Sequence, residues 1–375
     1  MGYHADVFTR FDDPTKRLCE EKNKNLKIIR IKSGETIHLE PFDIYQTLPE
    51  FINNIKRFVT DMNYDIIHSY YWLSGAVAYN LKKKYGIPFV HKFCSIGAYK
   101  HDTITADKYE KTIRLQEEKK ILLSADRIIA ATPIEIGIYK KYYGHKKSNI
   151  SVVSNGVRLD YFYGIPAHKA RKKLKINKKF VIIFVGRLNL NKGIDTLFKV
   201  IPVFLNKYKL EKFIFFIIGG NNKEINNILK YSISNNLFGD FNPFHYIFFC
   251  GMVDNCNLNI YYSAADVCVI PSRYEGFGNV AIEAMACKTP VVASNTGGLK
   301  YVVENGENGF LVDKNSVNEF ADKIYLLLTN PRLRKEFGKN GRKCVEKKFD
   351  QRLITKKIIT IYLSIFNNRI QEEII

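Results

Sequence analysis

The chain has 375 residues, of which 46% are hydrophobic, and its formal net charge is +21. This composition predicts two globular domains and argues against a membrane-spanning protein, because no apolar run approaches the length of a membrane span. The positive charge would suit nucleic acid or anionic lipid. The lysines are scattered, however, with no basic arm or RNA-binding signature, so we expect no nucleic-acid partner.

Seven cysteines show no Cys-x-x-Cys spacing, and several fall in apolar strand-like runs. An odd count of this kind predicts reduced thiols and a cytoplasmic protein. The basic composition leaves open a weak peripheral association with the inner face of a membrane.

Strand-like runs alternate with helical stretches along the first half of the chain. This order is typical of an α/β protein with parallel sheets and crossover helices. The predicted strands are 4–9, 27–31, 65–68, 88–93, 127–131 and 151–153. The predicted helices are 48–61, 73–85, 106–124 and 133–142.

The second half repeats the scheme after a polar linker near 155–171. We therefore expect two doubly wound domains, 1–158 and 159–348, followed by a terminal helix, 349–375, that packs back on the first domain. The predicted strands are 181–185, 213–218, 247–250, 267–270, 291–293 and 310–312. The predicted helices are 195–205, 223–235, 258–263, 279–287, 299–304, 317–328 and 331–345.

The most informative stretch follows the predicted strand 267–270. Glu275-Gly276-Phe277-Gly278 predicts a tight loop, and a helix begins at Asn279 with Val280. This order places unpaired backbone N–H groups at a helix N-terminus, which favours phosphate binding. Glu275 on the loop can reach sugar hydroxyls, and Glu283 on the helix can accept hydrogen bonds from a ribose diol. Taken alone, the stretch is more typical of a capped helix with two solvated glutamates, because glycine-loop matches are frequent by chance.

A second candidate loop, which carries positive charge, follows the predicted strand 181–185. Gly186-Arg187-Leu188 ends the strand, and Lys192-Gly193 precedes a helix. Arg187 can form paired hydrogen bonds with phosphate oxygens, and Lys192 can act as a point charge. The alternative is an ordinary basic turn. No Asp-x-Asp pair is convincing, so we expect no metal, and cationic side chains would stabilise a leaving phosphate.

Together these motifs resemble those of the retaining glycosyltransferases of family 4, which have the GT-B fold of two Rossmann-like domains. The resemblance rests on E-G-F-G-N-V-A-I-E, on Lys288-Thr289-Pro290-Val291-Val292-Ala293 with Gly297-Gly298, and on G-R-L-x-x-x-K-G. By motif, the sucrose-phosphate and inositol-phosphate branches are the most similar.

The resemblance implies a hexosyltransferase with its active site in the cleft between the domains. It would move a hexosyl group from a nucleotide sugar, with a UDP-sugar favoured, to a sugar, sugar-phosphate or lipid-linked hydroxyl, with retention and without a metal or other cofactor. The implied catalytic positions are Arg187, Lys192, Glu275 and Cys94. The implied donor-binding residues are Gly186, Arg187, Lys192, Met252, Glu275, Gly276, Phe277, Gly278, Asn279, Val280 and Glu283.

The first domain would hold the acceptor. His68-Ser69-Tyr70-Tyr71-Trp72 resembles a family motif in which the tyrosine at the position of Tyr71 contacts an acceptor phosphate. Arg114 and Glu118 match the family's R-x-x-x-E, although a surface ion pair would have the same spacing. The implied acceptor residues are Tyr71, Ser95 and Arg114, with Lys100 as a further candidate.

The chain departs from the family pattern in its first half. Cys94 replaces a histidine that orients the donor sugar, and a thiol is the poorer hydrogen-bond donor. We interpret this as a loss, because nothing nearby would lower the thiol pKa for a nucleophilic role. His91 is expected to be structural, and the region 39–48 lacks the acceptor lysine of phosphate-using relatives. The stretch 2–10 resembles the family's second strand, so the first strand and its glycine loop are expected to be missing.

Three alternatives stay open. A nucleotide-sugar binder with weak or no turnover would fit Cys94 and the missing strand. A nicotinamide dehydrogenase would fit two Rossmann halves, but it needs G-x-G-x-x-G after a strand, and no predicted strand has it. A nucleic-acid protein would rest on charge alone.

Overall fold

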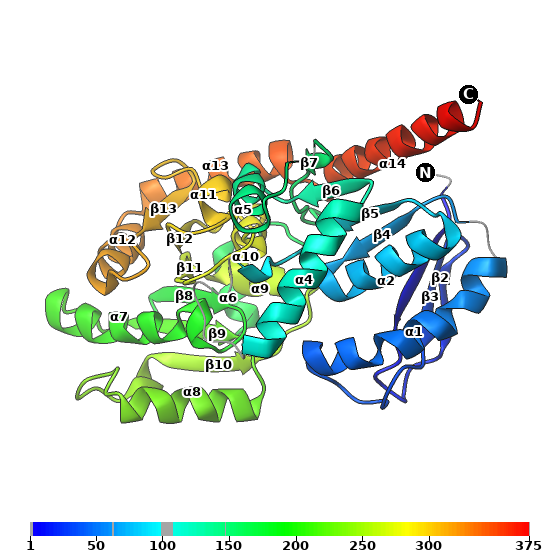
Figure 1. Cartoon of the computed structure of the whole chain (residues 1–375). Coiled ribbons are helices and arrows are strands. Elements are labelled where there is room, and N and C mark those ends of the chain that lie inside the picture. The colour runs from blue at the N-terminus through cyan, green and yellow to red at the C-terminus, as the bar shows by residue number, and fades with distance from the viewer. Residues whose placement is uncertain (1–2, 62–63, 99–107, 147, 375) are drawn as a thin grey trace. The chain divides into compact units, whose positions relative to one another are not determined.

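The computed structural model describes residues 3–61, 64–98, 108–146 and 148–374 (Figure 1). They form two compact units. Unit 1 contains Met1–Ala130, Ile136–Val152 and Thr360–Ile375, and unit 2 contains Ala131–Glu135 and Val153–Ile359.

Unit 1 contains two sheets. A three-stranded sheet has the order β1-β3-β2, and a four-stranded sheet has the order β4-β5-β6-β7. All pairs are parallel except β2 with β3. The strands are β1 (Ala5–Arg10), β2 (Cys19–Asn23), β3 (Leu26–Ile31), β4 (Ile67–Tyr70), β5 (Phe89–Lys92), β6 (Arg127–Ala130) and β7 (Ile150–Val152).

The helices of unit 1 surround a core that includes Trp72, Phe89 and Ile121. They are α1 (Pro41–Asp61), α2 (Tyr71–Tyr85), α4 (Lys108–Ser124) and α5 (Pro133–Tyr143), of which α5 begins in unit 2. The prediction that α1 begins at residue 48 was wrong. Proline is tolerated in a first helical turn and Asp43 suits the helix dipole there, so the helix starts at Pro41.

Unit 2 is built on one six-stranded sheet of order β10-β9-β8-β11-β12-β13, in which every pair is parallel. Its strands are β8 (Phe180–Val185), β9 (Phe213–Ile218), β10 (Ile247–Gly251), β11 (Val267–Ile270), β12 (Val291–Ser294) and β13 (Gly309–Val312). Its helices are α6 (Ala167–Lys173), α7 (Ile194–Lys207), α8 (Asn222–Ser234), α9 (Leu258–Ala264), α10 (Asn279–Ala286), α11 (Leu299–Val302), α12 (Val317–Thr329) and α13 (Pro331–Lys348), with 3-10 turns η1 (Leu190–Lys192) and η2 (Pro243–His245).

Strand β8 shows why this sheet is covered on both faces. Phe180, Ile182 and Phe184 lie in a core with α7 and α12. Val181 and Ile183 lie in a second core with α9 and α10. Successive strand residues point to opposite faces, so a run that is apolar throughout needs a helix layer on each side. The predicted α/β class and the two Rossmann-like domains are confirmed.

Two elements were absent from the sequence interpretation. Strand β2 is polar and largely exposed, so it has no apolar alternation to reveal it. Helix α6 lies partly within the predicted linker, where the small buried side chain of Ala170 gives little periodic signal.

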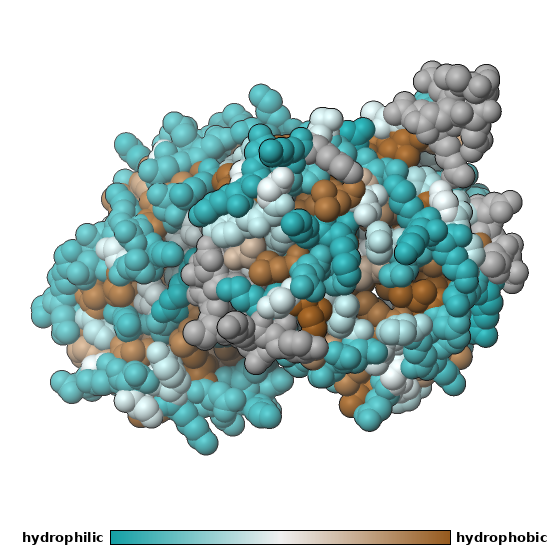
Figure 2. All heavy atoms as spheres, viewed as in Figure 1, coloured by the Kyte–Doolittle hydropathy of each residue, from teal (hydrophilic) through white to brown (hydrophobic). Residues whose placement is uncertain are grey.

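The terminal helix α14 (Gln351–Ile374) begins in unit 2 and ends in unit 1. In unit 1 the hydroxyl of Tyr362 is hydrogen-bonded to Nδ1 of His68. None of the described helices is long and apolar enough to cross a membrane. The face drawn in Figure 2 is mainly hydrophilic, with small separate hydrophobic areas.

Candidate active site

Several loops of unit 2 start at one edge of its sheet, because all six strands are parallel. Backbone hydrogen bonds connect neighbouring strand exits there. The Gly186 N–H donates to the Ile218 carbonyl at 2.9 Å, and the Gly219 N–H donates to the Gly251 carbonyl at 2.7 Å. This edge brings the predicted donor residues of unit 2 into one region.

The loop after β8 presents Lys192 at the end of η1. Asn189 caps this turn, since its Oδ1 accepts from the Lys192 N–H at 3.1 Å. Gly193 then turns into α7 with a φ of +70°, and a Cβ there would lie 1.8 Å from the Pro271 carbonyl oxygen. Only glycine allows this close approach between the loops that follow β8 and β11.

A pair of charged side chains joins the same two loops. The Nζ of Lys192 lies 2.7 Å from Oε2 of Glu275, and the Ser272 hydroxyl donates to that oxygen at 3.1 Å. Nearby, both terminal nitrogens of Arg273 donate to Asp195, at 2.9 and 2.6 Å. The Arg273 N–H also donates to the Asn191 carbonyl at 2.8 Å. Arg273 therefore holds the loop that carries Lys192.

A glycine pair after β12 supports the Glu275 loop. The Gly298 N–H donates to the Glu275 carbonyl at 2.9 Å. A Cβ on Gly297 would lie 1.9 Å from that carbonyl oxygen, and one on Gly298 would lie 2.4 Å from the Gly276 carbonyl oxygen. Three loops of unit 2 thus pack backbone against backbone, with no space for side chains between them.

Helix α10 begins directly after this loop. Gly278 is its N-cap with a φ of +108°, and no side chain caps the helix, so its first N–H groups can bind an anion. Phe277 is buried in the core, which leaves only its backbone for ligand contact. Asn279 is exposed and its Oδ1 accepts from Nδ2 of Asn155 at 2.8 Å, while Val280 is half-buried.

Glu283 lies on α10 against Tyr262 of α9. The Tyr262 hydroxyl donates to Oε2 of Glu283 at 2.8 Å. Burial raises the pKa of Glu283 to about 7, although the Tyr262 hydrogen bond opposes this shift. A carboxyl group in this setting is ready to accept hydrogen bonds from hydroxyl groups.

The three predicted acceptor residues come together in unit 1. The Arg114 guanidinium donates to the Ser95 carbonyl at 2.9 Å and to its hydroxyl at 3.1 Å, and it lies 5.2 Å from the centre of the Tyr71 ring. Its Nε donates to Glu118 at 2.8 Å. The Arg114–Glu118 pair is buried, with side-chain exposures of 8% and 0%, and is not the surface pair that the spacing also allowed.

Glu118 collects further donors in the same cluster. The Gly97 N–H lies 3.0 Å from each of its carboxylate oxygens, and the Tyr143 hydroxyl donates to Oε2. The network fixes the loop that contains Ser95 onto α4. Arg114 therefore has a clear positioning role.

Two family models match the chain in succession. The model described as "Glycosyltransferase Family 4" matches residues 1–161, and the one described as "Glycosyl transferases group 1" matches residues 167–344. D-inositol 3-phosphate glycosyltransferase 2 of Catenulispora acidiphila is 30% identical over 91% of this chain and 81% of its own length. The chain belongs to the family 4, group 1 glycosyltransferases.

Solved structures agree with this assignment. Sucrose-phosphate synthase of Thermosynechococcus elongatus is 31% identical, with a TM-score of 0.87 over 98% of this chain and 90% of its own. HepE of Anabaena, in complex with UDP and glucose, is 20% identical with a TM-score of 0.73 over 90% of this chain and 86% of its own, and supports the fold alone. The family and the GT-B fold predicted from the motifs are confirmed.

The other residues that the sequence singled out in this glycosyltransferase differ in how exposed they are. Cys94 is exposed, with a φ of +59°, and its Sγ lies 3.7 Å from the Lys92 carbonyl oxygen. Met252 follows β10 and its side chain is 80% exposed. His91 is fully buried, with Nδ1 2.8 Å from the Ser69 hydroxyl, and burial lowers its pKa to about 3. Lys100 lies outside the described residues.

Sequence reasoning missed Tyr262, Arg273 and Asp195. Arg273 lies two residues before the E-G-F-G-N-V-A-I-E motif, so its position could have suggested a role. Tyr262 and Asp195 carried no such signal, because they belong to other helices. Among the described residues, no group of three or more His, Cys, Asp or Glu side chains could hold a metal ion.

Proposed function

We propose that this glycosyltransferase transfers a hexosyl group from a UDP-sugar to a hydroxyl of a sugar, sugar-phosphate or lipid-linked acceptor, with retention and without a metal ion. The observation that carries the proposal is the Lys192–Glu275 pair of 2.7 Å beside the uncapped start of α10. It combines a cation, a carboxylate and free N–H groups at one edge of a parallel sheet.

In this proposal the donor diphosphate replaces Glu275 as the partner of Lys192. Arg187 is exposed at the same edge and would add paired hydrogen bonds to the phosphate oxygens. The dipole of α10 would favour the same negative charge. These groups would stabilise charge that develops as the bond between the sugar and the diphosphate breaks, which is the work that a metal ion does in other transferases.

The two glutamates would hold the rest of the donor. Glu275, once released from Lys192, would accept hydrogen bonds from sugar hydroxyls. Glu283 would accept them from the ribose. The exposed segment at Met252 would meet the base, and we take UDP as the first nucleotide to test.

The acceptor would bind in unit 1. Tyr71 and Ser95 lie on the Arg114 network, which sets their positions. The similar curated proteins are named for D-inositol 3-phosphate, and the similar structure for sucrose phosphate, so a phosphorylated polyol or sugar is the first acceptor class to test. The acceptor hydroxyl would attack on the face from which the diphosphate leaves.

Calorimetric titration with UDP, GDP and ADP tests the donor site. We expect UDP to bind selectively, and we expect Lys192→Gln and Glu283→Gln to weaken it, each with a parallel loss of hydrolysis or transfer of the UDP-sugar. Failure of every nucleotide to bind the folded chain would refute the proposal.

The second candidate, a nucleotide-sugar binder with weak turnover, is favoured by Cys94 at the position of the family histidine. It differs in one result. UDP would bind and respond to the same two variants, but no acceptor would give turnover above that of the Lys192→Gln variant.

A further inference from the structure

Two neighbouring strands of unit 2, β8 and β11, have an arginine paired with a buried aspartate at each end. At the starts of the strands, Arg171 donates to Asp266 at 2.7 Å and to the Lys179 carbonyl at 3.2 Å. Beyond their ends, Arg273 donates to both carboxylate oxygens of Asp195, at 2.9 and 2.6 Å. The two pairs have the same chemistry, but only the second lies at the edge where the candidate donor residues gather.

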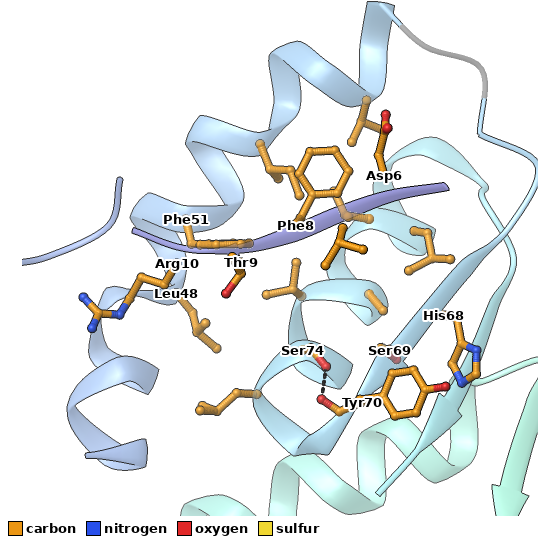
Figure 3. A pocket seen from close by; sticks show the side chains of 18 of the residues that line it. Asp6, Phe8, Thr9, Arg10, Leu48, Phe51, His68, Ser69, Tyr70 and Ser74 are labelled. Carbon is orange, nitrogen blue, oxygen red and sulfur yellow. Dashed lines mark hydrogen bonds between the residues drawn. The ribbon is translucent and has the colours of Figure 1, made fainter. Parts of the chain in front are cut away.

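An arginine that holds a loop need not serve a ligand site, as Arg10 of unit 1 shows. Arg10 lies at a cavity of about 580 Å³ (Figure 3). Its guanidinium donates to the carbonyl groups of Glu35, at 2.6 Å, and Ile37. In Figure 3 its side chain points away from the other labelled residues. Arg10 therefore fixes backbone, and what distinguishes Arg273 is the turn that it holds.

Arg273 contacts the chain on both sides of Lys192. Before Lys192, its guanidinium donates to the Leu190 carbonyl, and its backbone N–H donates to the Asn191 carbonyl at 2.8 Å. After Lys192, the same guanidinium forms the paired hydrogen bonds with Asp195. One residue therefore holds the η1 turn before and after the lysine that this turn carries.

Asp195 gives this contact a fixed base. It lies in the first turn of α7, and its side chain is only 5% exposed. Ile194 and Phe198 of the same helix are fully buried in the core. A carboxylate with so little access to water needs a cation and hydrogen bonds. Arg273 supplies both, so it connects the η1 turn to the core of unit 2.

The held turn places Lys192 against Glu275. The Nζ of Lys192 lies 2.7 Å from Oε2 of Glu275, and the hydroxyl of Ser272 donates to the same oxygen at 3.1 Å. Ser272 thus contacts the carboxylate, while the next residue, Arg273, holds the turn with the cation. A lysine side chain has many rotamers, so its charge is preorganised only if its backbone is fixed.

We propose that Arg273 is a positioning residue of the donor site, which holds Lys192 where the diphosphate of the nucleotide sugar binds. The inference rests on the proposed function, in which that diphosphate replaces Glu275 as the partner of Lys192. Arg273 does not contact the donor in this proposal, since its paired hydrogen bonds direct the guanidinium at Asp195. Its contribution to donor binding is made through Lys192.

The proposal requires an arginine and not only a positive charge. The planar guanidinium donates to both oxygens of Asp195 and to a carbonyl group at once, whereas a lysine ammonium is a point charge on a flexible stem. Arg273→Lys should keep a cation beside Asp195, so that the chain folds, but it should loosen the η1 turn. Arg171→Lys is the matched control, because it makes the same change at the other arginine–aspartate pair.

Titrations with UDP and with uridine separate positioning from general damage, since uridine carries no phosphate. We expect Arg273→Lys to weaken UDP binding about tenfold in calorimetry, within the range of about 10–10² that one charge-assisted hydrogen bond contributes. Uridine binding, followed by NMR of the ligand, should change by less than about twofold. Arg171→Lys should leave the affinity for both ligands unchanged.

A double-mutant cycle tests whether Arg273 acts through Lys192. In the Lys192→Gln background, adding Arg273→Lys should weaken UDP binding by no more than about twofold, because the cation that Arg273 positions is gone. An arginine that bound the phosphate itself, or that only stabilised the fold, would lower the affinity by the same factor in both backgrounds. That result, or equal weakening of UDP and uridine by Arg273→Lys, would overturn the proposal.

Amide exchange of the unliganded chain tests the held turn without a nucleotide. The N–H groups of Lys192 and Gly193 donate to the carbonyls of Asn189 and Leu190, each at 3.0 Å. Arg273→Lys, but not Arg171→Lys, should speed exchange in the segment 189–195 about tenfold. If the parent binds UDP and this exchange is unchanged, the inference fails and the proposed function stands. If the parent binds no nucleotide, the proposed function fails and the inference fails with it.

Discussion

In unit 2, the ammonium group of Lys192 lies 2.7 Å from the carboxylate of Glu275, although the two residues come from loops after different strands. The pair is largely sheltered, with side-chain exposures of 25% and 16%. In the proposed function, a diphosphate would replace Glu275 as the partner of Lys192, and a sugar hydroxyl would replace Lys192 as the partner of Glu275. Each charge would then have a partner both before and after the donor binds.

Replacing Lys192 with Gln should lower kcat/KM for a UDP-sugar by about 10²–10³, since one preorganised charge is lost from the leaving diphosphate. Glu275→Gln should leave UDP affinity equal or higher, because Lys192 loses a competing partner, while turnover falls. Lys199→Gln, an exposed change on α7, is the control and should do neither. A loss of UDP affinity in Glu275→Gln as large as in Lys192→Gln would contradict this account.

Glu283 should make stability depend on pH, because its pKa rises from 4.5 to about 7 on folding. Below pH 4.5 the carboxyl is protonated in both the folded and the unfolded chain, so it does not change the free energy of unfolding. Between pH 4.5 and 7 it ionises only in the unfolded chain, so the free energy of unfolding falls as pH rises; above 7 the loss is constant. Glu283→Gln should therefore be more stable than the parent above pH 7, by on the order of 3 kcal/mol.

Urea unfolding of both proteins at pH 4, 6 and 8 measures this difference, which should grow across the series. The same variant should bind UDP more weakly at pH 8, since an amide accepts fewer hydrogen bonds from a ribose than a carboxylate. A stability difference that does not change with pH would show that Glu283 is not buried as described.

The candidate donor motif could be predicted from the sequence because its residues are close together along the chain. Glu275 and Glu283 lie in one short segment, and a helix start after a glycine loop has a recognisable pattern. The Tyr262 partner of Glu283 comes from another helix, so no spacing rule could supply it. The burial that sets the Glu283 pKa was hidden for the same reason.

Unit 1 shows the other limit. The R-x-x-x-E spacing predicted the contact of Arg114 with Glu118, because residues four apart meet on a helix. It could not show that Tyr143 and the Gly97 N–H converge on the same carboxylate from other segments. The sequence also could not predict that the strands of unit 1 form two sheets, because periodicity identifies strands but not their neighbours.

Arg114→Met should destabilise the chain by about 3–5 kcal/mol, because it leaves the Glu118 carboxylate buried without its cation. The double variant Arg114→Met, Glu118→Met should recover part of this loss. Lys120→Gln removes an exposed lysine that pairs with Glu117 and serves as the control, with a change below about 1 kcal/mol. Urea denaturation measures all three. If Arg114→Met were as stable as the Lys120→Gln control, the result would contradict a buried Arg114–Glu118 pair.

Cys94→His should increase turnover of the UDP-sugar without weakening UDP binding, because histidine is a stronger hydrogen-bond donor than the thiol that replaces it here. The Cys94→His variant should fold normally, because Cys94 is exposed and histidine is among the residues that tolerate a φ near +59°. Cys94→Val is the control, since a β-branched residue is disfavoured at positive φ and donates no hydrogen bond. Steady-state kinetics and UDP titration on the three proteins decide the matter, and equal turnover in all of them would remove Cys94 from the mechanism.

The glycine contacts of unit 2 have a thermodynamic consequence. Gly193 packs against Pro271, Gly297 packs against Glu275, and the Gly298 N–H donates to the Glu275 carbonyl. The loops around the candidate donor site are therefore held together by contacts within unit 2, and we expect them to be ordered before any nucleotide binds. Binding should involve little conformational entropy loss and no large heat-capacity change from loop folding, unlike a site that assembles around its ligand.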